Sequence, residues 1–450
     1  MALAERAATS GAATVDVADF IDQKPVGGFQ IRILLMCFAV LFIDGYDTQA
    51  LGYIAPALSQ DWKLARGALG PVFSASLFGL MIGVLTLAPI ADVLGRKRII
   101  LFSAVAFGVC SLATAFVPDY NWLLAVRFLT GLGLGGALPN AIALTAEFSP
   151  HRRRATMVMS MFIGFSAGAA IGGFIAAALL PGYGWRSIFV VGGIAPLLLA
   201  PLVAVPLPES IRYLTLAGKR DAEVSSLLTR IAPGSTFPQG AHFVINEPAI
   251  VGMPVAHLFR EGRTVATLLF WVVFFMSLLD IYLLANWLST VLNDLGASVS
   301  ASAAIGAMFQ VGGVVGAFAL GNIIDRFTFR AMSLIYLGTA LAIFLIGQSG
   351  HSIPLATVAI FFGGFFLIGG QNAANALSST FYPTMVRSTG VGWALGIGRI
   401  GSIIGPFVGG IMLANKVSTE TVFAYAAVPA LIACLASFAL VGVVRRLNAR

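Results

Sequence analysis

Two carboxylates stand inside the first long apolar stretch of the chain. Asp44 and Asp47 lie within the run from Ile33 to Leu58, which holds no other charged residue. A charged side chain at the centre of a membrane costs about 2.5 kcal/mol or more. Residues three positions apart share one face of a helix, so this face must point to a wet cavity or to the polar core of a bundle. Carboxylates in such places commonly carry protons.

The composition is that of a protein that crosses a membrane many times. Only 10% of the 450 residues are charged, 58% are hydrophobic and the mean hydropathy is +0.92, whereas a soluble domain has about 25% charged residues. Cys37, Cys110 and Cys434 all lie in apolar runs, and the four histidines lack ligand spacing. We therefore expect no disulfide framework, no metal and no cofactor. The first thirty residues lack the pattern of a cleaved signal, so we expect the first span to be retained.

Apolar runs of about the 20 residues needed to cross a membrane predict twelve transmembrane helices. We expect an all-α membrane protein with two six-helix bundles, 32–207 and 264–444, a cytoplasmic tail at 1–31, a linker at 208–263 and a short tail at 445–450. The linker is too short for a catalytic domain, and Asp221 starts a short amphipathic helix in it. The predicted spans are 32–58, 68–91, 99–117, 122–146, 155–180, 187–207, 264–292, 301–324, 331–349, 353–377, 388–413 and 420–444.

The basic residues predict that both termini are cytoplasmic. That orientation places 21 of the 27 Lys and Arg residues in cytoplasmic segments, four in outer loops and two, Arg127 and Arg399, inside spans. Positive charge gathers on the cytoplasmic side of membrane proteins. The net charge of +8 therefore reflects topology and does not indicate a nucleic-acid partner.

The two halves of the chain repeat each other at a constant offset. Adding 233 to a residue number relates Asp47 to Asp280, and it matches further glycine, proline and charged residues: Asp61 and Asp294, Gly79 and Gly312, Gly83 and Gly316, Asp92 and Asp325, Pro150 and Pro383, Arg154 and Arg387, Gly168 and Gly401, Gly172 and Gly405. Six spans repeated in one orientation predict two bundles about an axis along the membrane normal, with a binding site between them near the midplane. Asp44 corresponds to Ser277, so we expect the N-terminal bundle to handle protons principally.

The loops APIADVLGRKRII and GNIIDRFTFR join the second to the third span of each half. They resemble the signature loop of the major facilitator superfamily. The resemblance implies a cytoplasmic latch that holds the bundles together in the outward-open state, formed by Asp92, Gly95, Arg96, Arg98, Asp325, Arg326 and Arg330. Ala88 and Val93 depart from the signature, which implies a weaker latch in the first half. Topological anchoring alone would explain the basic residues but not the paired aspartates.

Arg127 begins a glycine-rich fourth span. Its glycines do not follow a strand, so a dinucleotide-binding loop is excluded and close helix packing is the expected role. A rise of about 1.5 Å per residue places both Asp47 and Arg127 roughly 22 Å above the cytoplasmic face, so we expect them to meet. Asp280 comes to a similar height, and Arg399 lies near mid-depth. Glu147, at the cytoplasmic end of this span, is expected to form a structural ion pair.

Four longer strings narrow the resemblance: DGYDTQALGYIAPALSQDW, RFLTGLGLGGALPNA, PESIRYL and FYPTMVRSTGVGWALGIGRIGSIIGP. Together they are similar to the aromatic acid:proton symporters, with the 4-hydroxybenzoate/protocatechuate permeases the nearest group, over residues 15 to 445. The resemblance implies that Asp44, Asp47 and Arg127 are essential for transport. It leaves the substituents on the ring undecided.

Several polar and aromatic residues are candidates for binding such a substrate. Arginine binds carboxylates bidentately, so Arg399 and Arg127 suit a benzoate-type anion, although Arg399 could instead tie two helices together. Hydroxyl and amide side chains could read a ring hydroxyl: Tyr282, Asn286, Gln371, Asn372 and Asn375. Trp393, Trp287 or Phe162 could stack on the ring, although most aromatic residues in spans are packing residues.

Taken with these residues, the resemblance implies a proton-coupled importer of an aromatic carboxylate in a bacterial inner membrane, acting as a monomer. Asp44, Asp47, Arg127 and Asp280 are the expected proton-coupling residues. Protons that accompany the anion offset its movement against an inside-negative potential, which costs about 2.3 kcal/mol per 100 mV. A proton-antiporting exporter would use the same residues, and a membrane sensor of aromatic acids is the alternative from another class. An enzyme is not expected.

Overall fold

A computed structural model describes residues 14–216, 220–238, 241–245, 254–350, 352–383 and 386–448. In these ranges twelve helices are long and apolar enough to cross a membrane, as the sequence predicted. The first six are α3 (Gly28–Asp61), α4 (Gly70–Leu94), α5 (Arg96–Thr114), α6 (Tyr120–Leu134) continued by α7 (Ala137–Glu147), α8 (His151–Tyr183) and α9 (Arg186–Ala204). The other six are α12 (Thr264–Asp294), the two halves of α13 (Val299–Gln348), α14 (Ile353–Phe381), α15 (Arg387–Ala414) and α16 (Thr419–Asn448).

The helices depart from simple straight spans in two places. The fourth span turns at Gly135 and Gly136, between α6 and α7. The eighth and ninth spans follow each other so closely that they form one element, α13, with a sharp kink at Thr328, whose φ is 49°. The loop between these two spans is therefore reduced to a bend.

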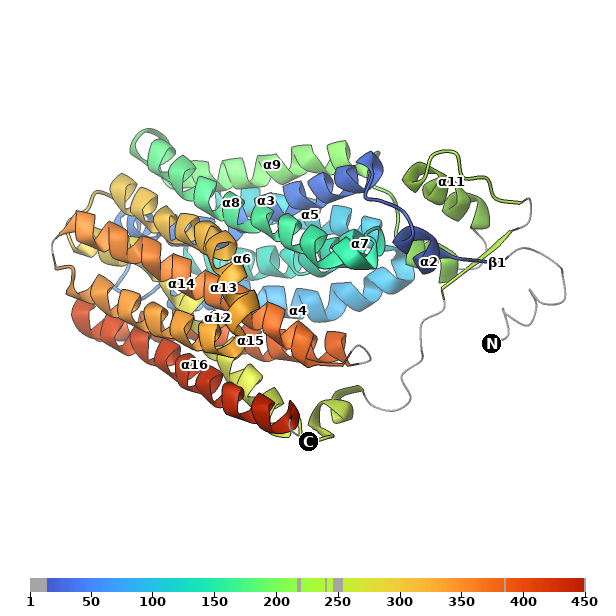
Figure 1. Cartoon of the computed structure of the whole chain (residues 1–450). Coiled ribbons are helices and arrows are strands. Elements are labelled where there is room, and N and C mark those ends of the chain that lie inside the picture. Colours follow the sequence, from blue (N-terminus) through green and yellow to red (C-terminus); the bar gives the residue numbers. More distant parts are fainter. Residues whose placement is uncertain are drawn as a thin grey trace.

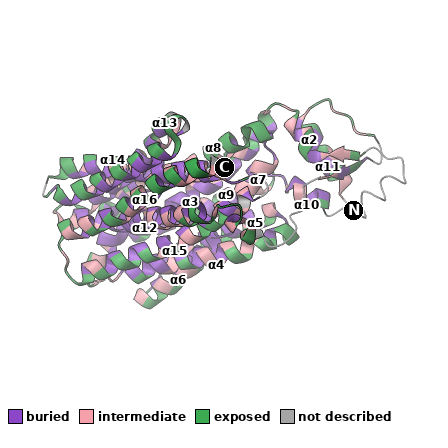
Figure 2. Cartoon of the chain, turned by 60° about the horizontal axis from the view of Figure 1, so that its bottom comes forward, coloured by how far each residue is buried: buried purple, intermediate pink, exposed green. Residues whose placement is uncertain are grey.

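The helices form two bundles that lie side by side (Figure 1). Helices α3 to α9 make the N-terminal bundle, and α12 to α16 make the C-terminal bundle. The outward faces carry exposed apolar side chains such as Leu85, Val205 and Phe438, and exposed residues follow the outer faces of both bundles in Figure 2. An apolar outer surface of this extent suits contact with lipid chains.

The internal repeat holds in space as well as in sequence. A β-carbon added at Gly79 would lie 2.1 Å from the carbonyl oxygen of Phe128, and one added at Gly312 would lie 2.0 Å from that of Phe361. Gly312 and Phe361 each lie 233 residues after Gly79 and Phe128, which is the offset of the internal repeat. The same displacement relates further close approaches: Gly83 and Leu132 to Gly316 and Phe365, Gly131 and Ser76 to Gly364 and Phe309, Gly168 and Phe42 to Gly401 and Phe275. Corresponding helices of the two halves therefore pack in the same register.

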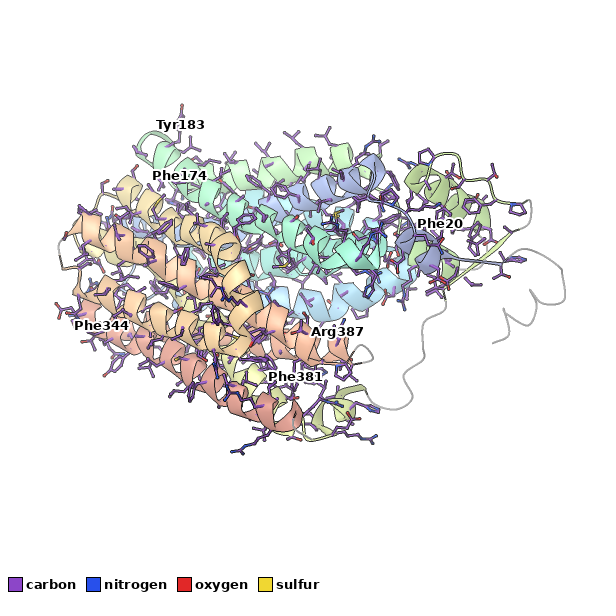
Figure 3. The ribbon with its side chains drawn as sticks, viewed as in Figure 1. Phe20, Phe174, Tyr183, Phe344, Phe381 and Arg387 are labelled. Atoms are coloured by element: carbon purple, nitrogen blue, oxygen red, sulfur yellow. The ribbon has the colours of Figure 1, made fainter. Side chains whose placement is uncertain are left out.

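The two ends of the bundles differ. The linker end carries α2, α11 and Phe20, and the far end carries Tyr183 and Phe344 (Figures 1 and 3). Contacts between the bundles pair α3 with α12, α4 with α15 and α8 with α13. At the far end Arg66 forms an ion pair of 2.5 Å with Asp294. Nearby, a β-carbon on Gly67, whose φ of +81° requires glycine, would lie 2.0 Å from the carbonyl oxygen of Gly410. The bundles are thus held closed at the far end.

A small cap covers the linker end of the N-terminal bundle (Figure 1). It consists of β1 (Thr14–Asp16), α2 (Val17–Asp22), α10 (Ile211–Leu216), α11 (Asp221–Ile231) and β2 (His242–Val244), and η1 (Pro254–Phe259) leads into α12. Strand β1 pairs with β2 in parallel, with Thr14 opposite His242. Val17 and Ile21 pack with Val224 and Leu228 of α11, the amphipathic helix predicted from the sequence, in one apolar cluster. The two strands were not predicted, because three residues are too few for a recognisable alternation.

Candidate functional site

A buried ion pair joins the first and fourth spans. The Nη2 atom of Arg127 donates to Oδ2 of Asp47 at 2.9 Å, and Nη1 lies 3.4 Å from Oδ1. Their side chains are 1% and 0% exposed. This is the contact that the estimated depths predicted. A two-point arrangement of this kind fixes both groups, and removing either partner would leave a buried charge uncompensated.

Residues from two further helices complete the surroundings of this pair. Ser111 of α5 donates to Oδ1 of Asp47 at 2.6 Å, and the guanidinium of Arg127 lies 5.2 Å from the ring centre of Phe189 in α9. The Nε atom of Arg127 has no hydrogen-bond partner among the described residues. The pair is therefore held from four helices of one bundle and retains one unused donor. Ser111 and Phe189 were not predicted, because neither carries a sequence signal of its own.

Asp44 lies one turn closer to the linker end and has no ion pair of its own among the described contacts. It is 1% exposed and accepts a hydrogen bond of 3.1 Å from Thr48. Arg399 and Asp47 are the charged groups that act on it across the interior. Asp44 is thus within electrostatic range of a cation of the C-terminal bundle and of the carboxylate one turn along its own helix.

The predicted residues of α12 and α15 meet each other. Arg399 donates to the hydroxyl of Tyr282 at 3.2 Å, and the amide of Asn286 donates to the backbone of Tyr282 at 2.7 Å. The sequence left open that Arg399 links two helices. The structure shows this link between α15 and α12, and Arg399 bonds a hydroxyl group there rather than a carboxylate.

A small pocket lies between the two bundles, against this site. The N-terminal bundle contributes Arg127 and Thr48, and the C-terminal bundle contributes Tyr282 and Asn286. Its remaining walls are mainly apolar: Leu51, Phe73, Ser76, Leu77, Leu80 and Leu134. A few polar groups from opposite sides in an apolar surface are the composition typical of a small-molecule site, although in this conformation the space holds only about one water molecule.

The other predicted binding residues lie elsewhere. In α14, Gln371 is buried, Asn372 and Asn375 are half-buried, and Gln371 lies 3.5 Å from Asn375; none of the three lines the pocket. Trp393 stacks on Trp271, with ring centres 5.9 Å apart. Trp393 is six residues closer to the linker end than Arg399, so this conformation separates it from the pocket.

Asp280 is buried in the middle of α12 and is 0% exposed. Neither of its carboxyl oxygens has a hydrogen-bond partner among the described residues. Asp280 therefore makes no hydrogen bond to the Asp47–Arg127 pair, with which the sequence had grouped it.

The residues predicted to form a latch do not bridge the bundles in the described contacts. Arg96 pairs with Glu147 and, at 3.5 Å, with Asp92, all within the N-terminal bundle. Gly95 makes the turn between α4 and α5, with φ of 101°. Arg98, Arg326 and Arg330 are exposed, and the side chain of Asp325 lies outside the described residues. A latch for the outward-open state is not expected to be engaged when the far end is closed, so its role stays a prediction.

Comparisons with known proteins place the chain in a family. Residues 37–278 and 270–449 match the family model of the Major Facilitator Superfamily. The chain belongs to the Major Facilitator Superfamily. It is 42% identical to the 4-hydroxybenzoate transporter PcaK of Pseudomonas putida, over 93% of this chain and 94% of that protein. It is 41% identical to a gallate transporter of Pseudomonas putida, over 95% of each chain.

Solved structures agree with this assignment at the level of the fold. The partially occluded, inward-open xylose transporter XylE from E. coli matches with a TM-score of 0.73 and 17% identity, over 91% of this chain and 97% of that one. The expected family, that of the aromatic acid permeases, and the expected twelve-helix fold are both confirmed. The chain is therefore a multi-pass membrane transporter and not an enzyme.

Proposed function

We propose that this transporter imports an aromatic carboxylate together with protons by alternating access, in a bacterial inner membrane and as a monomer. One observation carries the proposal: Arg127, which is paired with the buried Asp47, lines a pocket between the bundles that Tyr282 lines from the other bundle. The names of the relatives, a 4-hydroxybenzoate and a gallate transporter, supply the substrate class.

Exchange of partners at Arg127 couples the proton to the substrate. While Asp47 is ionised, it occupies both terminal nitrogens of the guanidinium. A proton on Asp47 removes that negative charge and leaves a buried cation that the carboxylate of the substrate can neutralise. Substrate and proton then stabilise the same state of the protein, which is the requirement for symport. Asp44 receives the proton next to this pair, under the influence of Arg399.

The ring lies between the bundles. Leu51, Phe73 and Leu77 provide apolar walls, and Tyr282, held by Arg399, reads a ring hydroxyl. The amides of Gln371, Asn372 and Asn375 in α14 join the site when the bundles change their relative tilt. Trp393 is less well placed for stacking, because it already stacks on Trp271.

The linker end faces the cytoplasm, because most of the basic residues lie there. Both termini are then cytoplasmic, and the conformation described here, closed at the far end, is inward-facing. Import proceeds when the far end opens, substrate and protons bind, and the bundles return to this state. Opening requires the ion pair between Arg66 and Asp294 to separate.

The test is uptake of labelled 4-hydroxybenzoate by proteoliposomes with an imposed proton gradient. We expect accumulation and alkalinisation of the outer medium with wild type, and no proton-driven accumulation with Asp47→Asn. Accumulation that survives in Asp47→Asn would refute the assigned role of Asp47. When an inward gradient of 4-hydroxybenzoate is imposed instead, acidification of the medium rather than alkalinisation would identify an exporter. An absence of substrate-stimulated flux would favour a sensor.

A further inference from the structure

Asp280 is a buried acid for which the mechanism above has no use. It lies in the middle of α12 with 0% of its surface exposed, and both carboxyl oxygens lack hydrogen-bond partners among the described residues. A carboxylate in such surroundings is strongly disfavoured, whereas a neutral carboxylic acid is tolerated. The structure thus favours a bound proton at this position.

The repeat shows why Asp280 differs from its counterpart. Asp280 corresponds to Asp47, and the same offset takes Arg127 to Ile360. The alignment of the two halves is well defined at Ile360, because the next residue, Phe361, contacts Gly312 in the same way that Phe128 contacts Gly79. Ile360 is fully buried in α14. The C-terminal bundle therefore keeps the acid and replaces its cation with an apolar side chain.

Among the described residues, the groups around Asp280 do not supply another cation. Ser277 lies one turn before Asp280 on the same face of α12, and Tyr336 of α13 is within electrostatic reach of Asp280. Both side chains are buried, and neither hydroxyl has a hydrogen-bond partner among the described residues. Helix α14 has no ionisable side chain. The other ionisable groups at this height on helices packed against α12 are Arg399 of α15, which binds Tyr282, Cys434 of α16, and Asp44 and Asp47 of α3.

We propose that Asp280 is a second proton-binding site, held in the C-terminal bundle and separate from Asp44, Asp47 and Arg127. This inference rests on the proposed proton symport. A proton bound at Asp280 enters the cycle with the substrate. It leaves to water when movement of the bundles hydrates the carboxyl group, and the hydroxyls of Tyr336 and Ser277 relay it without retaining it. The site adds one positive charge to each turnover, so an inside-negative potential drives uptake more strongly than it would with the Asp47 site alone.

The experiment compares wild type, Asp280→Asn and the control Asp61→Asn in proteoliposomes, with 4-hydroxybenzoate as the probe. The ratio of protons to substrate is obtained from the membrane potential that just prevents net flux at a set pH difference. We expect Asp280→Asn to carry one proton fewer per substrate than wild type, and to retain exchange of internal for external 4-hydroxybenzoate. Asp61 is an exposed acid at the far end, bound to Arg186, so its variant should keep the wild-type ratio.

The outcomes separate the two proposals. An equal ratio in wild type and Asp280→Asn would overturn the second site while leaving symport intact. No proton flux in wild type would instead refute the proposed function. If Asp280→Asn does not fold, infrared spectroscopy of Asp44→Asn replaces it: the carbonyl band of a protonated, buried carboxyl group is expected at neutral pH, and its absence would overturn the inference.

Discussion

Gln60 donates a hydrogen bond of 3.0 Å to Asn293 across the interface between the two bundles. The separation of these two residues along the chain equals the offset of the internal repeat. Two equivalent residues that contact each other must lie close to the axis that relates the halves. The far-end closure is therefore built around that axis, with Arg66 and Asp294 beside it.

Weakening this closure should favour opening at the far end. The ion pair of Arg66 and Asp294 is partly exposed, and such pairs contribute about 0.2 to 1 kcal/mol. Arg66→Gln should therefore raise the rate at which an impermeant thiol reagent modifies a cysteine at Ser74 by about 1.5- to 5-fold. Both rates are measured in a variant whose three native cysteines have been replaced. The double variant Arg66→Asp with Asp294→Arg should restore the slow rate; failure to do so would show that the pair does not hold the closure.

The geometry of the buried pair predicts that charge alone is insufficient at position 127. Lysine offers a point charge and cannot reproduce the two-point contact that Arg127 makes with Asp47. Arg127→Lys should lower the initial rate of proton-driven uptake about tenfold or more, roughly 1.4 kcal/mol. Arg186→Lys is the matched control, because Arg186 pairs with Asp61 at the exposed far end. Equal rates in the two variants would argue against a two-point role.

Tyr282 is expected to sense the hydroxyl group on the ring. Tyr282→Phe removes the oxygen that accepts from Arg399, and a single hydrogen bond contributes about 0.5 to 1.5 kcal/mol. The KM for 4-hydroxybenzoate should rise about two- to tenfold, and the KM for benzoate should change less. Tyr425→Phe, at an exposed tyrosine of α16, serves as the control. A similar rise for both substrates would assign Tyr282 to positioning Arg399 instead.

The repeated glycine contacts predict matched losses of stability. A β-carbon at Gly131 would lie 1.9 Å from the carbonyl oxygen of Ser76, and one at its counterpart Gly364 would lie 1.7 Å from that of Phe309. Gly131→Ala and Gly364→Ala should each destabilise the protein by about 1 to 3 kcal/mol, because backbone must move. Gly396→Ala meets nothing within 4 Å and should be neutral or slightly stabilising. Thermal unfolding in detergent compares the three, and equal midpoints would contradict the close packing.

The contact between Asp47 and Arg127 could be predicted because every residue of a helix adds the same rise, about 1.5 Å, so depth follows from counting. The stacking of Trp393 on Trp271 could not, because it depends on how α12 and α15 rotate about their axes. Hydropathy does not report that rotation when a helix is apolar nearly all round.

The latch shows a second limit. Asp92 and Arg96 belong to a recognisable motif, but the proposed alternating access requires at least two arrangements of the linker end. In this one Arg96 binds Glu147 of its own bundle. A sequence motif names the participants in a contact and does not say in which conformation they meet.

The strand pairing of the cap has a mechanical consequence. Because β1 is joined to β2 and both rest on the N-terminal bundle, most of the predicted linker, 208–263, belongs to that bundle. The next described element along the chain is η1, which begins at Pro254 and contacts α12 and α15 of the C-terminal bundle. In the proposed transport cycle, the cap therefore moves together with the N-terminal bundle. The C-terminal bundle changes its tilt relative to both.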